Sequence, residues 1–189
     1  ARLYTLPSEF GRVYRAAIAT NPINSLASIL YLVSRDSTGN LVPSPDVLKD
    51  NIATYINEYR LVGDAIDILD ARIINYRVKV SVIAGIGSNL QDIASKIKSE
   101  ITSLTDKNNF QIGSPLIESD FINAIINVQG VLALESIKFE NLNGVIFDRT
   151  YSPSRIDMEV IREKGMYFAD RGDIFEMRFP NHDIEITVQ

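Results

Sequence analysis

The chain carries few of the side chains from which catalytic or metal-binding centres are built. It has one His and no Cys, which excludes disulfides, thiolate nucleophiles, Cys-containing zinc or iron–sulfur sites and any site made of two or three His. The single imidazole belongs to His182, within the turn-forming stretch Phe179-Pro180-Asn181-His182-Asp183. An exposed turn histidine is its simplest interpretation. Carboxylates and lysines can still perform acid–base chemistry, so enzymes are disfavoured rather than excluded.

Three aspartates, Asp64, Asp67 and Asp70, recur at every third residue. Carboxylates grouped in this way could bind a cation or support hydrolysis. However, Ile66 and Ile68 interleave with them, and this pattern is typical of a strand with an acidic edge. We therefore predict no catalytic, cofactor-binding or metal-binding residues, and we expect no cofactor.

Two short motifs also favour turns over binding sites. Gly85-Ile86-Gly87 lies between a predicted strand and a predicted helix, where a dinucleotide-binding loop would lie, but Leu90 occupies the position of the third Gly. Arg171-Gly172-Asp173 matches an adhesion tripeptide, but a tight turn into the following strand explains it better.

Net charge and composition limit the partners. The net charge is −5 and no run of four Lys or Arg occurs, so we expect neither nucleic acid nor a membrane surface as a partner. The longest aliphatic–aromatic run, residues 29–33, is far shorter than the roughly 20 residues of a membrane-spanning helix. The start, Ala1-Arg2-Leu3-Tyr4, has neither a signal-peptide pattern nor an initiator Met, so we expect a processed chain or a piece of a longer one.

Apolar periodicity predicts both helices and strands. Helices are expected over residues 8–18, 44–59, 88–104 and 119–126, each with a serine near its start as the N-cap: Ser8, Ser44, Ser88 and Ser119. Strands are expected over residues 24–35, 65–84, 131–139, 145–151, 174–179 and 184–188. In the second of these strands, Tyr76, Val78, Val80 and Val82 should face the core while Arg77, Lys79 and Ser81 face the solvent.

Turn residues predict how some of these strands pair. Asn143-Gly144 is a strong hairpin signal and predicts that the strands on either side of it pair with each other. The turn at residues 180–183 predicts a second hairpin at the C-terminal end.

These patterns predict an α+β fold in which two related α/β units pack as one domain, with a C-terminal β-hairpin arm. The length of the chain, 189 residues, fits one domain. We place the domain at residues 1–149, with units at about 1–84 and 85–149, and the arm at 150–189. The two units are suggested by the similar helix starts at residues 6–10 and 116–121.

The predicted arm is rich in aromatic and Met side chains. These are either a local core beneath the hairpin or a subunit contact, where such residues are enriched, and the sequence leaves both interpretations open. If these residues form a subunit contact, deleting residues 150–189 should abolish self-association and leave a folded domain. The candidate contact residues are Met166, Tyr167, Phe168, Phe175, Met177 and Phe179.

The order of several motifs resembles a known family. The motifs are Ser119-Asp120-Phe121, Val128-Gln129-Gly130-Val131, Gly39-Asn40-Leu41-Val42-Pro43 and Arg60-Leu61-Val62-Gly63-Asp64, with the alternating strand at 78–82. Together they resemble the baseplate J-like family, the wedge subunits of contractile phage tails and related contractile injection systems. The resemblance covers roughly residues 5–145, and the arm resembles the larger wedge proteins of myophages. The chain departs from the family pattern after the first predicted helix, where Asn21-Pro22-Ile23 stands instead of a Val-x-Gly-Val turn.

The resemblance implies a structural role without catalytic residues. Such subunits form homo-oligomers (a dimer or a ring) and contact other wedge and hub proteins in the tail baseplate of the virion, which is assembled in the cytoplasm of the bacterial host. Two alternatives remain open. One is a free-standing module that binds a small molecule or peptide in a deep apolar pocket. The other is a carboxylate-based hydrolase that uses Asp64, Asp67 or Asp70.

Overall fold

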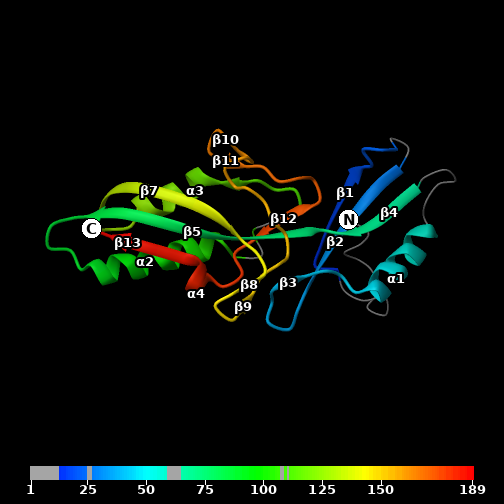
Figure 1. The fold of residues 1–189 in the computed structure, drawn as a ribbon, viewed down its shortest axis with the longest axis horizontal. Coiled ribbons are helices and arrows are strands. Elements are labelled where there is room, and N and C mark those ends of the chain that lie inside the picture. Colours follow the sequence, from blue (N-terminus) through cyan, green and yellow to red (C-terminus); the bar gives the residue numbers. More distant parts are fainter. Residues whose placement is uncertain (1–12, 25–26, 59–64, 107–108, 110) are drawn as a thin grey trace.

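A computed structural model describes residues 13–24, 27–58, 65–106, 109 and 111–189 of the chain. It confirms the α+β class, because helices and several sheets occur together. The molecule is elongated, with a first lobe built from β1 to β4 and α1 and a second lobe built from the remaining elements (Figure 1). Among the described residues, no helix is long and apolar enough to cross a bilayer.

A nearly continuous extended segment joins the two lobes. Strand β4 (Ala65–Asp70) belongs to the first lobe, and β5 (Arg72–Ala84) is the central strand of the second, with Ala71 between them. The amide of Ala71 donates to Leu32 in the first lobe, whereas the amide of Arg72 donates to Gly172 in the second. The change of partner therefore occurs between two adjacent residues, which leaves the connection little slack.

The first lobe is a sheet covered on one face by a helix. Strand β2 (Ala27–Arg35) pairs antiparallel with β1 (Arg15–Thr20) and with β3 (Leu41–Val42), and parallel with β4. Helix α1 (Asp46–Asn57) packs Leu48 and Ile52 against this sheet. The expected strand at 24–35 and the expected helix at 44–59 are confirmed in substance.

The helix expected over residues 8–18 is wrong for its described part. Residues 15–20 form β1, whose Ala17 and Ile18 lie opposite Tyr31 and Leu30 of β2. Small and β-branched residues suit pairing with a buried strand, and that tertiary partner overrides the weak helical spacing. The predicted Ser8 cap and the repeat at residues 6–10 lie outside the described residues.

The second lobe is a sheet centred on β5. Strand β7 (Val131–Leu142) pairs antiparallel along one edge. Strands β12 (Asp173–Glu176) and β13 (Ile184–Val188) follow each other along the opposite edge, both parallel to β5. Asn75 illustrates the order, because it lies opposite Leu142 of β7 and Glu176 of β12.

Neither predicted hairpin forms. The strand before Asn143 pairs with β5 rather than with residues 145–151, because β5 offers a longer apolar partner. The strands β12 and β13 run in the same direction, with the short helix α4 (Pro180–Asp183) between them, so they do not pair with each other. The boundary expected between residues 149 and 150 would therefore divide a single sheet. Strands β12 and β13 come from the last 40 residues of the chain, whereas β5, with which both pair, lies before the boundary.

Two helices cover the inner face of this sheet. They are α2 (Leu90–Leu104) and α3 (Glu118–Ile126), which bury Ile97, Ile101 and Phe121 against the predicted inward residues of β5. The predicted alternation is confirmed: Tyr76, Val78, Val80 and Val82 are at most 3% exposed.

The outer face of the sheet carries alternating charges. Glu140 of β7 accepts from Arg77 at 2.7 Å and Lys79 at 3.0 Å, and Glu185 of β13 accepts from Arg77 at 2.9 Å. Burial raises the pKa of Glu140, but the hydrogen bonds from Lys79 and Arg77 outweigh it, so the net pKa is lowered. Half-exposed pairs of this kind contribute little stability, and their main effect is to keep the three strands in register.

The N-caps differ from the predicted serines. Asn89, not Ser88, caps α2, and its side chain accepts from the amides of Gln91 and Asp92. Pro45 and Ile117 occupy the cap positions of α1 and α3 without a side-chain hydrogen bond. The helices were predicted from their apolar faces, and these faces, rather than the caps, determine their positions.

Two small sheets project from the body. A three-stranded one contains β6 (Leu116–Ile117), β11 (Met166–Tyr167) and β10 (Arg162–Glu163). A hairpin contains β8 (Val145–Ile146) and β9 (Arg149–Thr150). They lie on opposite sides of the second lobe (Figure 1).

The two lobes meet through a buried junction. An apolar cluster joins Val33 and Leu41 of the first lobe to Ile73 and Ile174 of the second. The buried carboxylate of Glu176 accepts from the Leu41 amide at 2.7 Å and from the Asn75 side chain at 2.8 Å. The lobes are therefore linked by apolar packing and by buried hydrogen bonds. Removing one partner of such a bond would leave the other buried without a partner.

Gly172 permits the close approach of the lobes at this junction. A Cβ at this position would lie closer than 3.0 Å to three atoms of the Tyr31 ring. We expect Gly172→Ala to reduce the free energy of unfolding by about 1–3 kcal/mol, because the ring or the backbone must move. Urea unfolding measures the loss, and Tyr31→Ala in the same chain should recover part of it. Additive losses in the double variant would contradict the predicted clash.

Candidate interaction surface

Three of the six predicted contact residues are enclosed by this chain. Tyr167, Phe175 and Met177 are at most 3% exposed within the core of the second lobe. The Phe175 ring meets the Tyr76 ring edge to face at 6.1 Å, and Tyr167 contacts Phe139 at 5.0 Å. Burial raises the pKa of the Tyr167 hydroxyl to about 12. These observations support the local-core interpretation for these three residues.

The other three predicted contact residues differ in exposure. Met166 and Phe179 are partly buried, and the Phe179 ring packs edge to face on Tyr151 at 5.5 Å. Phe168 is the most exposed of the six, at 44%. The structure therefore does not bring the six together as one surface, and Phe168 is the member that a partner can reach.

The predicted acidic group does not converge on one site. Asp64 lies outside the described residues. Asp67 and Asp70 are three residues apart on β4, so their side chains lie on opposite faces of the sheet. Asp67 accepts from Asn21, and Asp70 accepts from the Ser44 amide and from Lys49. Within the described part of the chain, no group of three or more His, Asp or Glu is placed to hold a metal ion.

The two motifs predicted as turns are turns. Gly87 has a φ of 82° between β5 and α2, which supports the turn interpretation. Arg171 and Gly172 form a turn into β12, and Asp173 is buried and paired with Arg72 through two hydrogen bonds. The Asp173 carboxylate is therefore not available to an adhesion receptor. Gly130 of the Val-Gln-Gly-Val motif has a φ of 101° and lies against Ile93, so it requires glycine.

The hairpin β8–β9 is not predicted from the sequence. Its turn residues, Phe147 and Asp148, have φ values of 46° and 62°, which a two-residue hairpin turn requires and which Asn-Gly usually provides. Phe147 is 86% exposed at the tip, and Val145 is 72% exposed beside it. No pattern in the sequence signals this turn, because Phe-Asp is not typical of it.

The base of this hairpin is fixed to α4. The Tyr151 hydroxyl donates to Asp183 at 2.7 Å in a buried contact, and the Phe179 amide donates to the other oxygen of Asp183 at 2.7 Å. Arg149 contacts the ring nitrogen Nδ1 of His182 at 2.8 Å. His182 is thus an exposed helix residue that helps to hold the hairpin, rather than a free turn histidine.

Asp183 is expected to make the stability of the hairpin base depend on pH. Burial raises its pKa above the usual 3.8 in the folded chain, so the folded state binds the proton more tightly than the unfolded chain. The resulting cost in folding free energy is absent below pH 3.8, where Asp183 is protonated in both states. It grows as the pH rises from there through the raised pKa of the folded chain. The stability advantage of the wild type over Asp183→Asn, measured by urea unfolding at several pH values, should therefore shrink as the pH rises. A constant difference would contradict this expectation.

An open groove of about 590 Å³ follows the end of β7. It lies between residues 138–143 and the segment 155–159, which is held to β7 by a hydrogen bond from the Ile156 amide to Asn141. Five of its lining residues are charged: Lys138, Glu140, Arg155, Asp157 and Glu159. An open, charged groove of this kind suits a protein surface better than a small apolar ligand.

Comparison of the sequence with protein-family models and with curated proteins finds no match. The family resemblance described above therefore stays a prediction.

Proposed function

We propose that this chain is a structural subunit of the baseplate wedge of a contractile phage tail or a related contractile injection system. It would hold surfaces in fixed positions for copies of itself and for neighbouring wedge and hub proteins. The motif resemblance supports the family. The arrangement of the two lobes supports the way in which the chain would work, which is to keep its contact surfaces at a fixed separation.

The observation that carries the proposal is the locked junction between the lobes. The β4–β5 connection changes partner between adjacent residues, and Glu176 links Leu41 to Asn75 within the junction. An assembly subunit needs contact surfaces whose separation does not change when one of them is occupied. A buried junction held by apolar packing and by hydrogen bonds to Glu176 supports this rigidity.

The two alternatives receive less support from the described residues. A binding module would have a deep apolar pocket, whereas the groove beside β7 is open and half of its lining residues are charged. The more apolar hollow beside β4 and α1, which includes Ile66 and Ile68, is also open rather than deep. A carboxylate-based hydrolase needs two carboxylates that face one substrate, whereas Asp67 and Asp70 lie on opposite faces of β4 and have protein partners.

The direct test is to locate the chain in particles. Gold-labelled antibodies against this chain should bind at the distal end of contractile tails purified from its natural source, as seen by electron microscopy. Particles that carry no label, although the antibody recognises the chain in a dissociated sample of the same particles, would contain the chain with its epitope out of reach. Mass spectrometry of the purified particles tests independently whether the chain is present. Particles without the chain would contradict the proposal.

A further inference from the structure

Strand β4 is an edge strand of the first lobe. It pairs with β2 along one side, and none of the other described strands pairs with its opposite side (Figure 1). In an extended strand, alternate residues direct their amide and carbonyl groups to opposite edges, so about half of these groups in β4 point away from β2. An edge of this kind is a template for one further strand.

An open groove of about 550 Å³ includes the consecutive residues 66–69 of this strand. The groove is also lined by α1 and by the loop at residues 21–23. Ile66 and Ile68 are partly buried on the face that α1 covers, whereas Leu69 is 46% exposed on the other face. Ile23 of the loop is 96% exposed. A partner can therefore reach apolar side chains around this edge of β4.

The loop at residues 21–24 is held in place beside the groove by Asn21. The Asn21 oxygen Oδ1 accepts from the amides of Ile23 at 2.9 Å and Asn24 at 3.3 Å. The Asn21 nitrogen Nδ2 donates to Asp67 of β4 at 3.1 Å. The groove is thus formed before any partner binds, which lowers the ordering cost of binding.

The groove carries an excess of negative charge. Lys49 is the one cation among its lining residues, and it pairs with Asp46 and Asp70 at 2.9 Å each. The other two charged residues of the lining, Asp50 and Asp67, have no ion-pair partner in the described part of the chain. A cation from outside would therefore be attracted to this edge.

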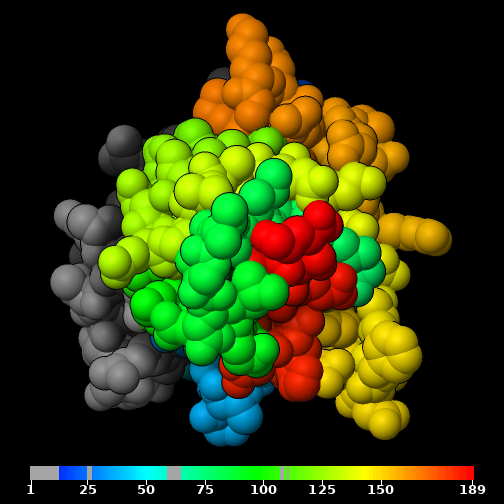
Figure 2. Space-filling view, turned by 90° about the vertical axis from the view of Figure 1, so that its left-hand side faces the viewer, coloured from blue at the N-terminus to red at the C-terminus, as the bar shows by residue number. Residues whose placement is uncertain are grey.

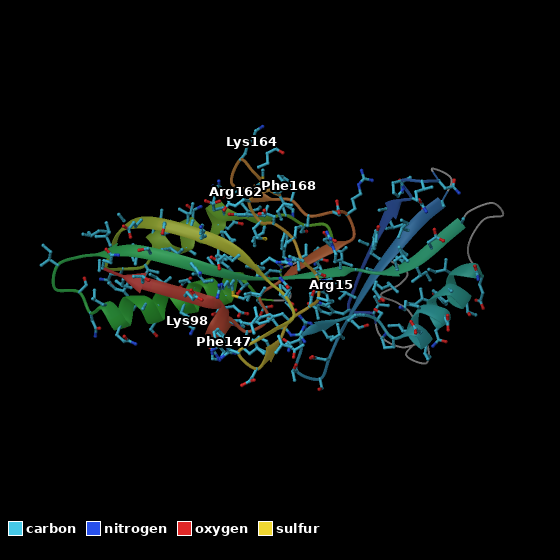
Figure 3. The ribbon with its side chains drawn as sticks, in the orientation of Figure 1. Arg15, Lys98, Phe147, Arg162, Lys164 and Phe168 are labelled. Atoms are coloured by element: carbon cyan, nitrogen blue, oxygen red, sulfur yellow. The ribbon has the colours of Figure 1, made fainter. Side chains whose placement is uncertain are left out.

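This charge limits what can occupy the edge. A second copy of β4 would bring two Asp67 carboxylates to one shared edge, and like charges in such pairs are destabilising. Lys98, Arg162 and Lys164 lie on the second lobe, away from β4, and do not neutralise the groove (Figure 3). The counter-charge must then come from another protein.

We propose that the free edge of β4 binds an extended segment of another protein, in which apolar residues alternate with Lys or Arg. The segment adds to the sheet as a further strand. Its apolar side chains face α1 together with Ile66 and Ile68, and its cations lie on the opposite face beside Asp67. An open groove suits such a ligand, because main-chain hydrogen bonds supply the affinity. This inference rests on the contacts with neighbouring proteins in the proposed function and names one of their surfaces.

Fluorescence anisotropy of the whole chain with a labelled peptide tests the site. The probe is a peptide of about eight residues in which Val alternates with Lys, and we expect a dissociation constant on the order of 10–100 μM that rises with salt. The same peptide with Glu in place of Lys should bind about tenfold more weakly or worse. No binding of the Lys peptide at about 1 mM, or equal binding of the Glu peptide, would overturn the inference.

Two N-methylated forms of the Lys peptide separate strand addition from attraction by charge alone. One form carries methyl groups on the amides of its odd-numbered residues and the other on those of its even-numbered residues. Since alternate amides face β4 and the solvent, one form should bind like the parent and the other should lose about tenfold in affinity or more. Equal affinities of the two forms would contradict strand addition.

Two variants locate the peptide on the chain. Asp67→Asn removes the charge but keeps an acceptor for Asn21, and Leu69→Ala removes an exposed apolar contact. Each should raise the dissociation constant of the Lys peptide about threefold or more. Both changes are on an exposed edge, so the melting temperature of the free chain should stay close to that of the wild type. Unchanged affinity in both variants would remove this groove as the binding site.

Leu132→Ala is the matched control. Leu132 is 71% exposed on β7, which is an edge strand of the sheet in the second lobe. The start of β7 lies at the end of the molecule that faces the viewer in Figure 2, remote from β4. This variant should bind the Lys peptide as the wild type does. If Leu132→Ala weakens binding and Leu69→Ala does not, the peptide pairs with β7 and the inference is wrong.

Sedimentation velocity of the whole chain tests a second copy as the occupant. The Lys peptide should leave the state of association of the chain unchanged. A chain that self-associates and is dissociated by the Lys peptide would show that a second copy takes the edge, contrary to the inference. Peptide binding is measured on the purified chain and does not depend on the labelling of phage tails, so this site and the proposed function can fail separately.

Discussion

Deletion of residues 150–189 is expected to leave a chain that does not fold. The deletion removes β12 and β13 from one edge of β5, and with them seven buried apolar side chains. At about 1.5–3 kcal/mol each, these side chains represent roughly 10–20 kcal/mol of gross burial, which matches or exceeds the net stability of a typical domain. Near-ultraviolet circular dichroism and the dispersion of amide resonances measure the loss.

The result would reverse the expectation from the sequence, which treated these residues as a separable arm. Phe168→Ser in the full chain is a suitable control, because it changes an exposed residue of the same region without removing a strand. This control should retain the native spectrum. A soluble fragment 1–149 that melts cooperatively would show that the sheet tolerates the loss of both strands, contrary to the structure.

Glu176→Ala is expected to cost about 3–5 kcal/mol, the usual range when one member of a buried charged pair is removed. The Glu176 side chain is fully buried and lies 3.7 Å from Arg178. Its loss leaves the Leu41 amide and the Asn75 side chain without these acceptors inside the junction. Urea unfolding measures the free energy, and amide hydrogen exchange at Leu41 should report local loosening of the junction.

Glu185→Ala provides the control for the removal of a carboxylate. Glu185 lies on the outer face of the same sheet, is 47% exposed and pairs with Arg77 at 2.9 Å. Exposed pairs are worth about 0–1 kcal/mol, so this variant should remain close to the wild type. Equal losses for the two variants would mean that the junction derives little from Glu176.

Local periodicity predicted the elements whose faces are strongly apolar. The alternation through Val78 and Val80 is a property of neighbouring residues, and it placed β5 and its buried face correctly. The spacing of Ile93, Ile97 and Ile101 likewise placed α2. The residues at 13–18 have apolar spacing that suits a helix, but pairing with β2 decided in favour of a strand.

These local patterns do not predict which strands pair when the strands are far apart in the sequence. Asn143-Gly144 signals a turn, but the partner of β7 is β5, which precedes it in the chain with α2 and α3 in between. The exposed position of Phe147 has no sequence signal, since its turn lacks the usual Asn-Gly and its exposure depends on where the hairpin is anchored. Tyr167, Phe175 and Met177 are typical of an interface by composition, but tertiary packing encloses them.

By itself, the sequence determined the α+β class, the buried face of β5, the helices α1 to α3 in outline, and the poverty in catalytic side chains. Only the tertiary structure decided that the last 40 residues complete the central sheet, that Glu176 joins the lobes and that Phe147 projects. The physical reason is that periodicity shows which face of an element is apolar, whereas the segment that covers this face is chosen by the packing of the whole chain.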